Sequence, residues 1–266
     1  MKLLSMGITQ FPQFSTEWFQ QIKMGLIPGY SIVSKFGSNG AVGTTYTTIS
    51  ASGIYNMPTS AAALEFVSSS TSDTSAGVGA REVTIVGLDS NWAEVTQTLI
   101  TNGTTAVALT TNLTRLYRWY VSSSGVYPTT MAATSHVGTL TIRAAGAGAT
   151  WSSIGLTNGI GRGQSQIGAY TVPTGKTGYV ILKQAHVDST KSADIILWQR
   201  PNASDVITPY SGAFGIVEEE LGVSSQSSYT PKSSHGPFVG PCDLLFQAKG
   251  ASSPGVSVDF EILIVG

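Results

Sequence analysis

The sequence predicts an all-β protein: two antiparallel β-sandwich domains of jelly-roll-like type, preceded by an N-terminal arm with one short helix. Short runs of residues alternate apolar and polar side chains, which is the period of a half-buried strand. Clusters of Gly, Ser, Thr and Asn, which favour turns, separate these runs. Among 266 residues, 41% are hydrophobic and only 11% are charged, as in a folded rather than a disordered chain. We place the arm at residues 1–40, the first sandwich at 41–155 and the second at 156–266.

The N-terminal arm is expected to contain the helix. Ser15 or Thr16 is a suitable N-cap, and Gly25 lies near the expected end. Two interpretations stay open: the apolar face of this helix packs on the protein's own body, or the arm docks on a neighbouring subunit. In the second interpretation the candidate partner contacts are the apolar residues Trp18, Phe19, Ile22 and Leu26.

The stretch 79–103 carries the clearest strand signal of the first sandwich. Its first run places Val83 and Ile85 on one face, and the turn-forming residues 88–91 follow. A second alternating run ends at Asn102 and Gly103, a dipeptide suited to a type I′ turn. We therefore expect two consecutive hairpins here, and further strands at 45–49, 63–68, 116–122 and 139–144.

The second sandwich is expected to begin after a glycine-rich linker or long turn at 155–168. Residues 170–187 contain two alternating runs around the turn 173–175. Further strands are expected at 193–199 and 242–248. In the last run, 256–265, every second residue from Val256 to Ile264 is apolar and should face one side.

Charge and hydropathy argue against nucleic-acid and membrane partners. The formal net charge is only −1, and the densest cationic pair, Arg115 and Arg118, would fall on opposite faces of a strand. No apolar run is long enough, at about 18 residues, to cross a bilayer.

We expect no metal, cofactor or disulfide. His136, His186 and His235 lack the spacing of a zinc site, and the single Cys242 has no internal partner and is expected to be a small buried residue.

No catalytic arrangement is predicted, so the chain is not expected to be an enzyme. The acidic run 218–220 would alternate sides on a strand and is interpreted as a solvated loop or a strand edge. The glycine-rich residues 159–164 lack the Gly-Lys-Ser/Thr ending of a phosphate-binding loop, and Ser165 does not lie in a Gly-x-Ser-x-Gly motif. A particle-borne hydrolase that uses the acidic run remains a third hypothesis.

Aromatic side chains on sandwich loops could give sugars an apolar platform. Trp119 and Trp198 lie within apolar runs, where burial is expected. The candidate platform residues are therefore Trp92, Tyr127 and Trp151.

The stretches 27–43, 79–103 and 161–180 resemble a family of virion structural proteins of tailed bacteriophages, common in aquatic phages, and the final strand 257–265 is similar to the last strand of that family. The resemblance transfers no site residues. It implies a non-enzymatic component of the virion, assembled in the host cytoplasm: a capsid decoration or cement protein that binds the major capsid shell or other virion proteins, or a piece of the neck or tail.

A virion protein packs against copies of itself, and we expect a homo-oligomer, with a trimer favoured. The alternative from another class is a receptor- or glycan-binding protein associated with the tail or a fibre.

Overall fold

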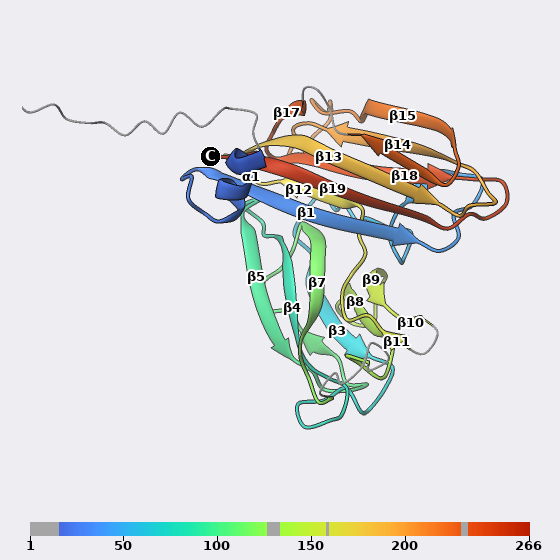
Figure 1. The fold of residues 1–266 in the computed structure, drawn as a ribbon. Coiled ribbons are helices and arrows are strands. Elements are labelled where there is room, and N and C mark those ends of the chain that lie inside the picture. Colours follow the sequence, from blue (N-terminus) through green and yellow to red (C-terminus); the bar gives the residue numbers. More distant parts are fainter. Residues whose placement is uncertain (1–15, 127–133, 158–159, 230–233) are drawn as a thin grey trace, which may run out of the picture.

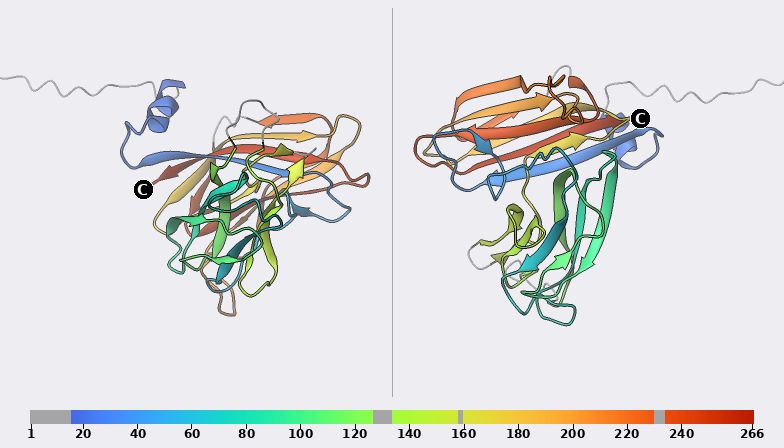
Figure 2. Two further views of the ribbon diagram at one scale, coloured as in Figure 1. Left: turned by 90° about the horizontal axis from the view of Figure 1, so that it is seen from below. Right: turned by 180° about the vertical axis from the view of Figure 1, so that it is seen from behind.

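A computed structural model describes residues 16–126, 134–157, 160–229 and 234–266. Within these ranges the chain is all-β, with antiparallel sheets and one short helix, as the sequence predicts. Figures 1 and 2 show an upper lobe and a lower lobe whose strands run crosswise to each other. The upper lobe is built from residues 30–50 and 167–266, and the lower lobe from residues 62–165.

The upper lobe consists of two sheets. Sheet 1 has the strand order β1-β19-β13-β16, with β17 also paired to β13, and sheet 2 has the order β12-β18-β14-β15, with β2 paired to β18. The bounds in sheet 1 are β1 Tyr30–Asn39, β13 Thr177–Val187, β16 Gln226–Tyr229, β17 His235–Val239 and β19 Val256–Val265. Those in sheet 2 are β2 Thr47–Thr48, β12 Ala169–Val172, β14 Ala193–Arg200, β15 Gly215–Val223 and β18 Cys242–Lys249.

The lower lobe contains two larger sheets and a short strand pair. Sheet 3 has the order β6-β3-β8-β9 and sheet 4 the order β5-β4-β7, while β10 pairs only with β11. The bounds are β3 Leu64–Ser68, β4 Ala80–Leu88, β5 Glu94–Ile100, β6 Val107–Ala108, β7 Arg115–Ser124, β8 Leu140–Ala144, β9 Thr150–Ile154, β10 Leu156–Thr157 and β11 Ile160–Gly161.

Each lobe has a hydrophobic core between its larger sheets. In the upper lobe the alternate residues of β19 from Val256 to Ile264 are buried, which confirms the predicted face, and Phe260 lies 4.8 Å from Phe246 of sheet 2 between ring centroids. In the lower lobe Phe66 of sheet 3 meets Trp119 of sheet 4 at 6.2 Å. Sheet-on-sheet burial of this kind is the main source of stability in all-β proteins.

The strand pair predicted at 79–103 is only half correct. β4 pairs with β5 from Glu82 to Leu88, and Val83 and Ile85 are fully buried, as the alternation predicts. The second hairpin does not form: Gly103 adopts the left-handed conformation, with φ of 59°, but β6 then pairs with β3 in the other sheet. The turn residue was correctly recognised, whereas the partner of the next strand depends on contacts distant in sequence.

The chain enters and leaves the lower lobe through two segments that lie side by side. Ala51 donates its backbone N–H to Gln166, and Gly168 donates to Ile49. Gly37 of β1 crosses them so closely that a Cβ at this position would lie 2.3 Å from the backbone nitrogen of Gly168. The lower lobe is therefore inserted between two adjacent segments of the upper lobe.

Residues 30–39, which the sequence analysis placed in the N-terminal arm, form β1. This strand pairs with β19 along its whole length, from Tyr30 with Val265 to Asn39 with Val256. Only the helix α1 (Thr16–Lys23) and the turn after it precede the sheet in the described residues. The cause of the difference is a pairing between the two ends of the chain, which local periodicity does not reveal (Figure 1).

A buried ion pair joins the lobes. The guanidinium of Arg115, at the start of β7, donates to both carboxylate oxygens of Asp243 on β18, at 2.8 and 2.9 Å, and both side chains are fully buried. The hydroxyl of Thr171 donates to Asp243 at 2.6 Å. The Arg115 guanidinium carbon lies 4.7 Å from the centroid of the Trp92 ring.

We predict that Arg115→Met lowers the free energy of unfolding by about 3–5 kcal/mol, because it removes the buried bidentate partner of Asp243 and leaves only Arg200, at 3.9 Å. Urea unfolding measures the loss. The matched control is Arg143→Met, whose pair with Glu65 is partly exposed; here we expect a loss of about 1 kcal/mol or less. Equal losses in the two variants would contradict a special role for the buried pair.

Candidate functional site

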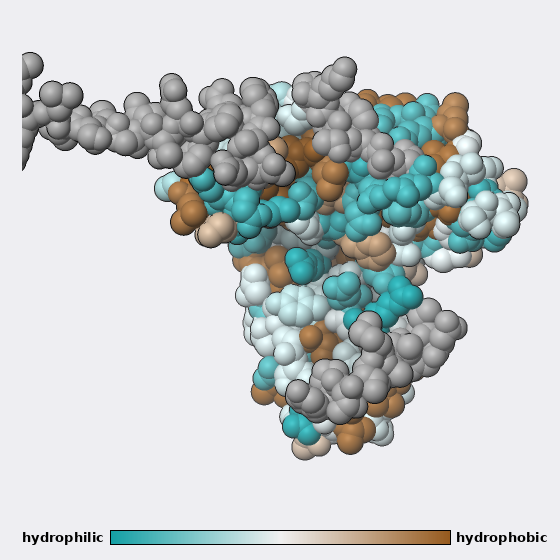
Figure 3. Space-filling model, in the orientation of Figure 1, coloured by the Kyte–Doolittle hydropathy of each residue, from teal (hydrophilic) through white to brown (hydrophobic). Residues whose placement is uncertain are grey.

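A cleft of about 460 Å³ lies where β1 passes the ends of β4, β5 and β7. We call it the inter-lobe cleft; Figure 3 shows the surface narrowing between the lobes at this level. A smaller hollow of about 170 Å³ shares Ser34, Lys35 and Arg118 with the cleft. The cleft is lined by Ile32, Val33, Ser34, Lys35, Val86, Glu94, Thr96, Tyr117, Arg118 and Tyr120. The smaller hollow adds Phe36, Gln164, Ser165 and Asp259.

Strand alternation brings two cations into the cleft from different lobes. Lys35 occupies an inward position of β1, on the same face as Val33, and is only 8% exposed. Arg118 lies on β7 beside Val86 of β4 and is exposed. The sequence expectation that it faces away from Arg115 is wrong. A bulge in β7 puts both arginines on one face of the sheet, because their register partners Val86 and Leu88 are two positions apart on β4. Lys35 donates a hydrogen bond to the backbone oxygen of Tyr117, the residue before Arg118.

The two cations lack a counter-charge. Among the residues that the structure describes, neither Lys35 nor Arg118 forms an ion pair. Burial, together with the smaller effect of the nearby Arg118 guanidinium, lowers the pKa of Lys35 to about 7. The only ring contact of Arg118 is with Tyr120, at 5.8 Å from the ring centroid, within the described part of the chain. In the part of the chain that the structure describes, no side chain forms an ion pair with the cations of the cleft.

Two carboxylates, Glu94 and Asp259, border the same hollows, but within the described residues neither forms an ion pair with Lys35 or Arg118. Glu94, an exposed residue of β5, accepts a short hydrogen bond from the Tyr117 hydroxyl. Burial raises the pKa of the Tyr117 hydroxyl, and the neighbouring Tyr170 and Glu94 raise it as well. Asp259 borders the smaller hollow, and burial raises the pKa of its carboxyl although His186 acts in the opposite direction.

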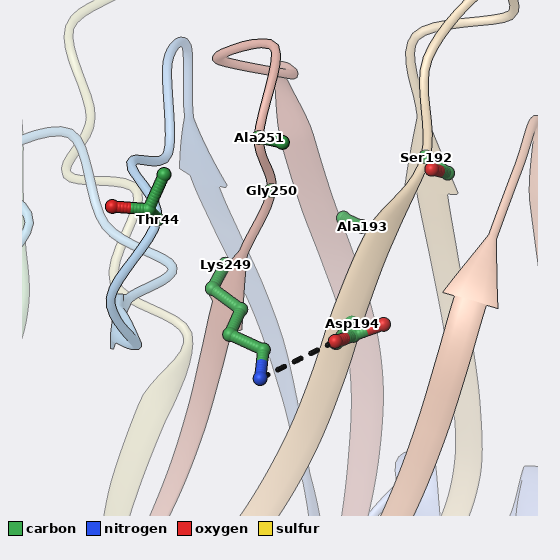
Figure 4. A pocket seen from close by; sticks show the side chains of 7 residues that line it. All are labelled: Thr44, Ser192, Ala193, Asp194, Lys249, Gly250 and Ala251. Carbon is green, nitrogen blue, oxygen red and sulfur yellow. Dashed lines mark ion pairs between the residues drawn. The ribbon is translucent and has the colours of Figure 1, made fainter.

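Two other hollows of the upper lobe offer no uncompensated charge. In the first, of about 280 Å³, Lys249 and Asp194 point toward one another and pair at 3.4 Å (Figure 4). The second, of about 300 Å³, is mainly apolar and is lined by Met57, Trp198, Phe214, Leu245 and Gln247.

The helix residues proposed as partner contacts divide between the protein's own body and solvent. Ile22 is buried at 3% exposure, and Trp18 packs edge-on against Phe19 and against Tyr30 of β1. Lys23 pairs with Glu261 of β19 at 2.7 Å. Leu26 follows the end of the helix and is 62% exposed. The helical stripe therefore packs on sheet 1, and Leu26 is the member left free for another chain.

The predicted sugar-platform aromatics are mostly unavailable. Trp92 and Trp151 are buried at 9% and 8% exposure, in the upper and lower cores respectively. Tyr127 lies outside the described residues. Trp119 is buried as expected and donates to Ser152 at 2.9 Å, whereas Trp198 is partly exposed at the apolar hollow. Burial thus excludes Trp92 and Trp151 as exposed ring faces.

The acidic run lies on a strand edge, as expected. Glu218 and Glu220 share one side of β15 and both pair with the buried Lys183, at 2.7 and 3.0 Å. Glu219, on the other side, accepts from Tyr46 at 3.2 Å. These ion pairs balance the charge of Glu218 and Glu220 and link β15 of sheet 2 to β13 of sheet 1.

The remaining candidates for chemistry are also structural. Cys242 is buried as expected, and burial raises its pKa to about 12, which keeps the thiol protonated. Within the described ranges, no group of His, Cys, Asp and Glu side chains could hold a metal ion. In the same ranges, no helix has the length and apolar character needed to span a bilayer.

Comparisons with known proteins leave the family open: no family model matches the chain, and no curated protein matches it.

Sequence reasoning overlooked Lys35, although a weak signal was present. Residues 27–43 were not predicted as a strand, so the inward position of Lys35 was missed. Its neighbour Tyr117 lies 82 positions away in sequence. A single lysine between Val33 and Gly37 in a period-two run is the pattern that could have identified it.

We predict that the stability of the protein rises with pH above 7 because of Lys35. An unfolded lysine titrates at about 10.4, so the unfolded chain binds this proton more tightly than the folded chain does. Between pH 7 and 8.5 the wild type should gain about 1–2 kcal/mol in free energy of unfolding relative to Lys35→Met. Urea unfolding at several pH values measures this difference, and parallel curves for the two proteins would refute the lowered pKa.

Proposed function

We propose that the chain is a non-enzymatic structural component of a tailed-phage virion, acting as a capsid decoration or cement protein. It binds the major capsid shell and further copies of itself, in a homo-oligomer that we expect to be a trimer. The resemblance of stretches 27–43, 79–103 and 161–180 to phage virion proteins supports this proposal. The antiparallel β architecture is compatible with it.

The observation that carries the self-association is exposed apolar surface along an edge strand. β15 ends sheet 2, and its Ile216 and Leu221 are 55% and 69% exposed. The loop before it adds Ile207, Tyr210 and Phe214, which are 76%, 59% and 43% exposed. Figure 3 shows hydrophobic surface in the part of the upper lobe where β15 lies. Edge strands of this kind readily pair with another chain unless something covers them.

We also propose that each lobe is one β-sandwich domain, of jelly-roll-like type. The separate hydrophobic cores support this division. In this arrangement the upper domain is discontinuous: it contains β1, β2 and β12–β19, and the lower domain is inserted between β2 and β12. The insertion differs from a consecutive division at residues 40 and 155.

The second candidate is a tail- or fibre-associated glycan-binding protein. The inter-lobe cleft favours it, because hydroxyl, amide and aromatic groups border an open hollow there. A surface site of this composition suits polar ligands with a ring.

We predict that the purified chain has a mass in solution of at least two times the 27.7 kDa of one chain, as a homo-oligomer requires. Ile216→Lys should shift it toward the monomer, since a charge on the β15 edge opposes pairing. Light scattering coupled to size-exclusion chromatography gives the mass. Ile100→Lys is the matched control, because Ile100 is 60% exposed on β5, the edge strand of sheet 4. A wild-type protein that is monomeric at tens of micromolar would count against self-association.

We predict that gold-labelled antibodies against the chain bind over the head of intact phage particles. A decoration protein coats the capsid shell, so labelling should be spread over the head. Electron microscopy of labelled particles, with an antibody to the major capsid protein as the positive control, gives the location. Gold confined to the tail would reject the decoration role and favour the glycan-binding candidate.

A further inference from the structure

We propose that the inter-lobe cleft binds an acidic saccharide, with the sugar carboxylate held between Lys35 and Arg118. This inference does not depend on the role of the chain in assembly, because it rests on the chemistry of the cleft alone.

Two cations of the cleft have no counter-charge in the described residues. Lys35 is nine-tenths buried and its ammonium carries three donors, of which the structure shows one in use, to the Tyr117 backbone oxygen. Arg118 approaches from the other lobe without an ion pair within the described residues. Burying a cation without a counter-charge is costly, and a bound anion would relieve that cost for Lys35, while the exposed Arg118 would add a second positive group. A planar carboxylate also matches the paired donors of a guanidinium.

The polar lining of the cleft distinguishes a saccharide from a simple anion. Glu94 lines the same cleft and accepts a hydrogen bond from the Tyr117 hydroxyl. The Glu94 carboxylate can accept hydrogen bonds from sugar hydroxyls while the anionic group of the ligand lies at Lys35 and Arg118 instead. Ser34, Thr96 and Gln164 add further donors and acceptors around the two hollows. A uronic acid carries one negative carboxylate next to several hydroxyl groups, and so matches the groups that the cleft offers.

The size and lining of the cleft suit a sugar ring. The cleft, at about 460 Å³, lies in the range of roughly 300–1,000 Å³ that is usual for ligand pockets. Tyr120, partly exposed beside Arg118, supplies an aromatic face of the kind on which sugar rings pack. The cleft is open to solvent along β1, so a chain end or an internal residue of a polysaccharide can enter it.

The test is calorimetric titration of the full chain with trigalacturonate at pH 6 and low salt, where Lys35 is protonated. The fully methyl-esterified form of trigalacturonate has the same sugar rings but no negative charge. We expect trigalacturonate to bind and the ester to bind at least about tenfold more weakly, the usual effect of losing a charged hydrogen bond. Equal binding of acid and ester, or no binding of trigalacturonate at millimolar concentration, would overturn the proposal.

Variants locate the site. Arg118→Gln removes an exposed cation and should weaken binding by about tenfold or more, without loss of folding as judged by circular dichroism. Arg81→Gln, on β4 five positions from the register partner of Arg118, is the control and should bind as the wild type does. Wild-type affinity in Arg118→Gln would place the ligand elsewhere. Inorganic phosphate that binds as tightly as trigalacturonate would also refute the saccharide assignment and leave only a general anion site.

Discussion

The arrangement of the lobes depends on the buried ion pair between Arg115 and Asp243. Both side chains are fully removed from solvent, and they lie 128 positions apart in the sequence. Separating the partners of a buried ion pair is costly, so a shift of the lobes that pulled Arg115 away from Asp243 would be unfavourable. Thr171 and the Trp92 ring complete the enclosure. The pair contributes to the specificity of the junction more than to net stability, since desolvation offsets much of its attraction.

The same junction explains why the cleft is cationic. A bulge in β7 puts Arg115 and Arg118 on the same face, and within the described residues only Arg115 meets a carboxylate. Lys35, from β1, lies next to Arg118 and is buried because β1 crosses the end of sheet 4. The fold therefore gives Arg115 a buried carboxylate partner and leaves the buried Lys35 and the exposed Arg118 without an ion pair in the described residues. Elsewhere in the described residues the buried Lys183 has two carboxylate partners, which shows how the chain treats a lysine that serves structure alone.

Local alternation predicted the elements that depend on nearest neighbours. The faces of β4 and β19 and the turn between β4 and β5 follow directly from residues adjacent in sequence. Strand partners did not follow: β1 joins β19 from the other end of the chain, and β6 leaves the hairpin for sheet 3. The candidate site could not be predicted from the sequence for the same reason, because Lys35 lies far from Tyr117 and Arg118 along the chain. The sequence placed Trp92 on a loop, but it is buried in the core of the upper lobe, where Arg115 from a later strand packs against its ring.

The proposed assembly surface and the proposed ligand site lie on different sides of the upper lobe. β1 ends sheet 1 and contacts β12, the first strand of sheet 2, so this side of the lobe faces the lower lobe. β15 ends sheet 2 on the opposite side, where Lys183 of β13 reaches across to it. Copies that associate through β15 would leave the inter-lobe cleft open. A multivalent array would then present one cleft per subunit, and even weak sites gain avidity when they engage a polymer together.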